Sequence, residues 1–142
     1  MNTTIKQATL TQMVEHLQDA YPNEGGGLLL GTMQGDIATV LEIAPALNTF
    51  PTEEQFHRMG LATDFWTQVE DSADARGLQI VGFYHSHPDH PAQPSIYDLD
   101  HAWVNMAYII VSVQDGKMDH IRNWQLKADR SAFEEITLTA VD

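Results

Sequence analysis

Apolar residues follow helical spacing in two segments of the chain. Between Leu10 and Ala20 they recur every three or four positions, and Pro22 follows where a helix would have to stop. Between Met59 and Ala75 they again fall on one helical face, which includes Phe65 and Trp66, and Gly77 follows as glycine commonly does after a helix. We therefore predict helices over Leu10–Ala20 and Met59–Ala75, with the two aromatic residues in the core.

Shorter apolar runs bounded by turn residues predict strands. A proline-rich loop and a short helix separate the earlier strands from the later ones, and a further loop is predicted at Asn48–Phe56. The predicted strands are Leu28–Leu30, Ile37–Ile43, Leu78–Tyr84, Ala107–Val113, Met118–Leu126 and Glu134–Val141, with the irregular segment at His85–Pro94 and the helix at Ser95–Asn105. Strands interrupted by two or three helices predict a mixed α/β (α+β) fold, with a central mixed sheet flanked by helices.

Length and charge narrow the class of protein. The chain has 142 residues, which favours a single domain over residues 1–142. Seven basic residues stand against twenty acidic ones, for a net charge of -13. Nucleic acids and anionic membranes are bound through clustered Lys and Arg, so both are excluded as expected partners. No apolar run approaches the about 20 residues of a membrane span, and the start of the chain lacks the layout of a secretory signal, so we expect a cytoplasmic protein.

The absence of cysteine restricts the chemistry further. With no Cys in the chain, a disulfide framework, a thiolate zinc site and a cysteine nucleophile are all excluded. Any metal must be held by His and carboxylate side chains.

One segment carries such side chains at informative spacing. His85 and His87 lie two residues apart at the end of a predicted strand, so both imidazoles can face the same ion. Asp98 adds a carboxylate from the first turn of the next helix. Two His and one carboxylate leave a fourth position open, as in catalytic zinc sites. Two other interpretations of these residues remain open. A His pair at this spacing recurs by chance, and Ser95 with Asp98 matches a helix capping box.

The surrounding pattern resembles the JAMM (MPN-domain) metalloprotease family. The family signature is an upstream Glu, then H-[ST]-H, seven residues, Ser, two residues and Asp. In this chain those positions are occupied, in order, by Glu24, His85-Ser86-His87, Pro88–Pro94, Ser95, Ile96-Tyr97 and Asp98. The flanking segments Tyr21–Glu24, Gly27–Gly31 and Val81–Tyr84 also fit, and the resemblance extends over most of the chain.

The resemblance implies a role for each signature residue. His85, His87 and Asp98 would bind one Zn²⁺ per chain, with a water as the fourth ligand. Glu24 would be the general base and Ser95 the hydroxyl that stabilises the oxyanion. It further implies hydrolysis of a peptide or isopeptide bond, and the expected substrate is the C-terminal tail of a ubiquitin-like or sulfur-carrier protein.

Some features leave alternatives open. Relatives often carry Cys where this chain has Gly26, and the three glycines 25–27 would leave the backbone beside the base unusually free.

Two other classes of protein stay open, a non-catalytic MPN scaffold for protein interactions and an iron oxygenase with two His and one carboxylate. The metal content of the protein would discriminate between them. The remaining histidines, which are His16, His57, His90, His101 and His120, are expected at the surface.

Overall fold

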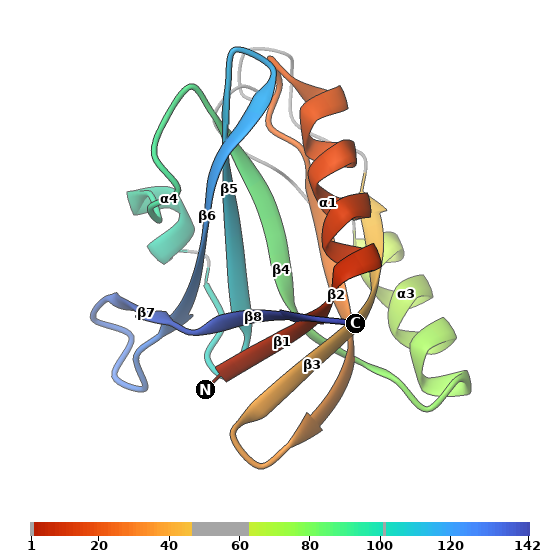
Figure 1. The fold of residues 1–142 in the computed structure, drawn as a ribbon. Coiled ribbons are helices and arrows are strands. Elements are labelled where there is room, and N and C mark those ends of the chain that lie inside the picture. The colour runs from red at the N-terminus through yellow and green to blue at the C-terminus, as the bar shows by residue number, and fades with distance from the viewer. Residues whose placement is uncertain (1, 47–62, 101) are drawn as a thin grey trace.

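A computed structural model describes residues 2–46, 63–100 and 102–142 (Figure 1). Its helices and strands alternate irregularly along the chain. They are, in order, β1 (Asn2–Lys6), α1 (Gln7–Ala20), β2 (Gly26–Gln34), β3 (Ile37–Ala46), α3 (Thr63–Ala75), β4 (Gln79–Pro88), α4 (Ile96–Asp100), β5 (Ala107–Gln114), β6 (Lys117–Leu126), β7 (Phe133–Ile136) and β8 (Leu138–Val141).

All of these strands form one mixed, 8-stranded sheet in the order β7-β6-β5-β4-β2-β3-β1-β8. β7 and β8 stand at opposite ends of this order, yet only Thr137 separates them in sequence. In Figure 1 they run across the molecule as one continuous blue segment. β7 pairs with β6, β8 pairs with β1, and the Thr137 carbonyl accepts a 3.0 Å hydrogen bond from the Thr3 N–H. The last segment of the chain therefore joins the two ends of the sheet.

Helices cover the sheet on both faces. α1 buries Thr9, Met13 and Leu17 at a spacing of four residues and packs them against one face. α3 and α4 lie on the other face, where Trp66 and Leu99 pack around Leu28, Phe83 and other buried residues. The central strands β2, β4 and β5 are consequently buried on both sides, which explains the apolar run that each of them contains. None of the helices in the described part of the chain has the length and apolar composition that crossing a membrane requires.

The predicted fold class is confirmed, since the sheet is mixed and flanked by helices. Four local predictions were wrong. β1 was missed, and β4 does not end at Tyr84 but continues through His85–Pro88, because these residues pair with β5. α4 is shorter than predicted, and the predicted strand Glu134–Val141 is divided at Thr137, because its two halves pair with different strands. The predicted loop Asn48–Phe56 and the start of the helix predicted from Met59 lie outside the described residues.

Candidate metal centre

The two histidines of the signature lie near the C-terminal end of β4. Side chains alternate along a strand, so His85 and His87 share a face with each other and Ser86 points to the opposite face. His85 is buried at 6% exposure. Pairing with β5 holds the backbone of both histidines in place, and His85 is also paired with β2, opposite Gly26.

Asp98 reaches the two histidines from the first turn of α4. One carboxylate oxygen of Asp98 lies 3.4 Å from His85 Nε2 and 3.5 Å from His87 Nε2, and the two Nε2 atoms are 3.1 Å apart. Zinc binds His and carboxylate ligands at about 2.0–2.2 Å, so two ligands of a tetrahedral zinc lie about 3.3–3.6 Å apart. The donor atoms therefore already stand near the spacing of three corners of such a site, and their chemistry suits zinc.

Hydrogen bonds with neighbouring groups orient two of the three donor side chains. Asp98 accepts from the Ser95 N–H at 2.8 Å, and the Asp98 N–H donates to Ser95 Oγ at 3.0 Å. This is the reciprocal pattern of a capping box, so the capping and metal readings of the two residues coexist. His87 Nδ1 donates to the Pro91 carbonyl at 2.9 Å, which leaves the Nε2 lone pair for an ion.

Charge around Asp98 favours its ionised form. Burial by itself would raise the pKa of Asp98, but the neighbouring imidazoles of His85 and His87 and the hydrogen bond from the Ser95 N–H together hold this pKa well below its usual range. The carboxylate is thus available as a ligand at neutral pH.

Glu24 is a buried carboxyl group at the entrance to β2. It is 4% exposed, and burial raises its pKa from 4.5 to about 8, with the nearby His87 opposing this shift and Asp98 adding to it. Glu24 and His87 line the same hollow of about 310 Å³, together with His90, Ser95 and residues of the proline-rich loop. Of the predicted site residues, the structure therefore brings Glu24, Ser95 and the three donor side chains to one place.

Ser86, the middle residue of the His pair, attaches the Glu24 segment to β4. Its Oγ accepts a 3.0 Å hydrogen bond from the Gly25 N–H, and its own N–H donates to the Gly25 carbonyl at 3.0 Å. The expectation of a free backbone at the three glycines was wrong. A Cβ at Gly25 would lie 2.8 Å from Ala20 Cβ, and one at Gly27 would overlap the Ala44 carbonyl oxygen, so these positions need glycine because the backbone is closely packed.

A second link joins the same two segments nearer the surface. Tyr21, just before the Glu24 segment, donates from its hydroxyl to Asp89 Oδ2 at 2.6 Å, and Asp89 Oδ1 accepts from the Asp115 N–H at 2.9 Å. Asp89 has a φ of 58°, a conformation that Asp tolerates better than most residues. Neither Ser86 nor Asp89 was assigned a role from the sequence, because their partners are distant in the chain.

Two histidines expected at the surface are half-buried. His16 Nδ1, on α1, lies 2.9 Å from the Tyr84 hydroxyl on β4. His120 accepts a hydrogen bond from the Ala92 N–H. His90 is exposed as predicted, while His57 and His101 lie outside the described residues. Trp66 packs on Phe83 and stacks on the exposed Trp103, in agreement with its predicted place in the core.

A mixed sheet flanked by helices, with two His at the end of a central strand and an Asp from the next helix beside them, is the arrangement of a JAB/MPN-type domain with a candidate metal centre. The chain matches the family model for prokaryotic homologues of the JAB domain over residues 6–127. It therefore belongs to this family.

Solved structures and curated proteins also resemble this chain. A solution structure of a protein from Salinibacter ruber is 39% identical, with a TM-score of 0.75 over 100% of this chain and 92% of that one. A structure described as JAMM, a metalloprotease-like zinc site in the proteasome and signalosome, has the same fold, with a TM-score of 0.59 and 20% identity over the whole of both chains. A human MPN domain-containing protein is 36% identical over 59 residues, which are 42% of this chain but only 12% of the human protein. This chain thus matches a small part of that relative.

Replacing one of the donor side chains should remove metal binding while leaving the fold intact. We expect His87→Ala, at the partly exposed end of β4, to lose bound zinc and to retain the wild-type circular dichroism spectrum. His90→Ala, in the same hollow but outside the donor group, is the matched control and should keep about one zinc per chain. Metal content by atomic emission after dialysis measures both variants. Unchanged zinc in His87→Ala would show that the ligand set is wrong, and iron in place of zinc in the wild type would favour the oxygenase class.

The raised pKa of Glu24 predicts how the stability of the metal-free protein depends on pH. Its pKa is about 8 in the folded protein against an ordinary value of 4.5, so between these values the folded state binds the extra proton. The free energy of unfolding should therefore fall as pH rises through this window, by up to about 1.4 kcal/mol per pH unit, and level off above pH 8. Urea unfolding with a chelator, from about pH 5 to pH 9, should show this slope as a difference between wild type and Glu24→Gln. A pH-independent difference would contradict the assignment.

Proposed function

We propose that this chain is a zinc-dependent peptidase or isopeptidase. The observation that carries the proposal is the position of Glu24, a buried carboxyl group that lines the same hollow as His87 and Ser95. A carboxyl group with a pKa near neutrality beside an open metal site is suited to exchanging protons with a water and a substrate.

Different residues of the hollow would carry out different steps of amide hydrolysis. When bound, zinc supplies Lewis acidity towards a carbonyl oxygen and lowers the pKa of water at its open position. The Glu24 carboxylate takes a proton from the attacking water and gives it to the leaving amine, which would otherwise depart as an unstable anion. Ser95 Oγ already accepts from the Asp98 N–H, so its own O–H remains to donate to the carbonyl oxygen as negative charge develops there.

The protonation of Glu24 couples this chemistry to metal loading. Without an ion, burial keeps the carboxyl group largely protonated at pH 7. A nearby positive charge favours the carboxylate, so a dication held by the donor group would turn Glu24 into a base. Because the chain contains no Cys, it can offer no thiolate as an alternative nucleophile.

For the substrate, we propose the C-terminal tail of a ubiquitin-like or sulfur-carrier protein. The hollow at Glu24 and a second hollow of about 300 Å³ share Gln93, Pro94 and Ser95, so they adjoin at these residues, and an extended chain that crosses them would contact both hollows. The second hollow is lined largely by apolar side chains, including Ile96, Leu99 and Phe133. A net charge of -13 disfavours a strongly acidic tail.

A non-catalytic MPN scaffold is the second candidate function. It would need none of the signature side chains, yet all of them are present, and the group of His85, His87 and Asp98 adjoins the hollow that Glu24 and Ser95 line. Their convergence favours the enzyme.

Substitution of the proposed base should separate metal binding from hydrolysis. Glu24→Gln removes the proton acceptor but keeps the size of the side chain, so we expect it to retain zinc and to lose at least about 100-fold in kcat. Glu15→Gln, on the exposed face of α1, is the control and should behave as wild type. The zinc-loaded proteins are incubated with C-terminally extended ubiquitin-like carriers from the same genome, and cleavage is followed by mass spectrometry. Full activity in Glu24→Gln would exclude Glu24 as the base, and wild-type protein inactive on every carrier and peptide would favour the scaffold.

The apolar hollow should contribute to substrate binding. Ile96 is 81% exposed at its rim, so Ile96→Gln removes apolar contact area without disturbing the core. We expect about a three- to tenfold loss in kcat/KM on a peptide with an apolar residue next to the cleaved bond, mainly through KM. Ile37→Gln, at an exposed position on β3 away from the hollow, serves as the control. Equal kinetics for the two variants would show that substrate does not use this hollow.

A further inference from the structure

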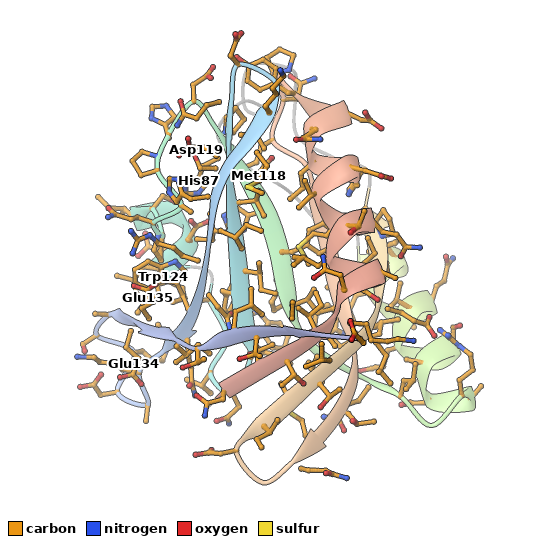
Figure 2. The ribbon with its side chains drawn as sticks, viewed as in Figure 1. His87, Met118, Asp119, Trp124, Glu134 and Glu135 are labelled. Atoms are coloured by element: carbon orange, nitrogen blue, oxygen red, sulfur yellow. The ribbon has the colours of Figure 1, made fainter. Side chains whose placement is uncertain are left out.

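Two side chains of β6 form hydrogen bonds with the proline-rich loop that follows β4. Ala92 is fully buried in this loop. Its N–H donates to His120 Nε2 at 3.0 Å, and its carbonyl accepts from Trp124 Nε1 at 2.9 Å. Figure 2 shows Asp119 and Trp124 on β6, with His87 between them in this view.

Hydrogen-bond chemistry determines the tautomer of both histidines that contact this loop. A backbone N–H can only donate, so His120 Nε2 must be unprotonated and the imidazole proton must lie on Nδ1. There it donates to Asp119 Oδ2, at 2.6 Å. A carbonyl can only accept, so the His87 Nδ1 that faces the Pro91 oxygen carries a proton.

These contacts form one chain of hydrogen bonds through a single peptide group. The Pro91–Ala92 peptide accepts from His87 at its oxygen and donates to His120 at its nitrogen. Consecutive hydrogen bonds of this kind polarise one another. The order is Asp119 carboxylate, His120 imidazole, the 91–92 peptide, and then the imidazole of His87, whose Nε2 faces His85 and Asp98.

We propose that His120, supported by Asp119, is a positioning residue for the metal centre. By holding the 91–92 peptide, it fixes the tautomer and the ring orientation of His87, and so directs the lone pair of Nε2 at the ion. The proposal rests on the proposed metal site but not on hydrolysis, and it gives function to a histidine that its place in the sequence does not connect to the site.

Two variants whose acceptor oxygens lie at different distances from Cα test it. Counted from Cα, the side-chain oxygen of Gln stands as many bonds away as His Nε2, whereas that of Asn stands one bond short. His120→Gln can therefore still accept from the Ala92 N–H, and His120→Asn cannot. Both substitutions are polar and sit at a half-buried strand position, so they perturb folding to a similar extent. Trp124→Phe is the control for loosening of the loop, because it removes a hydrogen bond to the Ala92 carbonyl without touching the 91–92 peptide.

The first measurement uses the metal-free protein. Nitrogen-15 NMR of labelled histidine should show a protonated His87 Nδ1 whose hydrogen exchanges slowly with water in wild type and in His120→Gln. In His120→Asn we expect this exchange to be at least about fivefold faster. The second measurement is zinc affinity by competition with a chelator, where we expect a loss of about tenfold in His120→Asn and less than about threefold in His120→Gln.

The outcomes are distinct. Slow exchange and full zinc affinity in His120→Asn would overturn the proposal, and so would an equal loss in His120→Gln. A loss in Trp124→Phe as large as that in His120→Asn would show that only the general anchoring of the loop matters, which also overturns it. Peptidase activity enters none of these readouts, so a chain that fails to cleave any substrate would refute the proposed function and leave this test intact.

Discussion

The antiparallel pairing of β2 with β4 is the constraint on which the site depends. It places Gly26 opposite His85, so the segment that carries Glu24 enters the sheet beside the strand that carries the two histidines. The Ser86 side chain, on the face that the histidines leave free, accepts from the Gly25 N–H, and the Ser86 backbone N–H donates to the Gly25 carbonyl. The alternation of a strand therefore lets three consecutive residues of β4 serve the donor group and the neighbouring carboxyl group at once.

Burial gives this arrangement its electrostatic character. Glu24 and Asp98 are both largely withdrawn from water, but their surroundings act in opposite directions. Asp98 lies among imidazoles and a backbone N–H that favour the carboxylate, whereas desolvation dominates at Glu24 and favours the neutral acid. Two neighbouring carboxyl groups with pKa values pushed apart can take different roles, one as a metal ligand and the other as a group that exchanges protons.

Much of the fold could be predicted from the pattern of apolar residues, because strands buried on both faces are continuous apolar runs. The prediction failed where pairing partners overrode local composition. His85–Pro88 contains polar residues and a proline, yet it stays in β4 because β5 runs parallel beside it. β1 is a short, largely polar strand whose extended form depends on β3 and β8, and no local pattern indicates these neighbours.

By itself, the sequence determined which chemistry is available and where along the chain its parts lie. The absence of Cys, the spacing of His85, His87 and Asp98, and the upstream Glu24 are properties of the linear order. Only the tertiary structure decided that these parts meet and which other residues support them. Ser86 reaches Gly25 across 61 positions, and His120 reaches Ala92 across 28. Such contacts arise from strand pairing and loop packing between distant segments, so their geometry exists only once the sheet has formed.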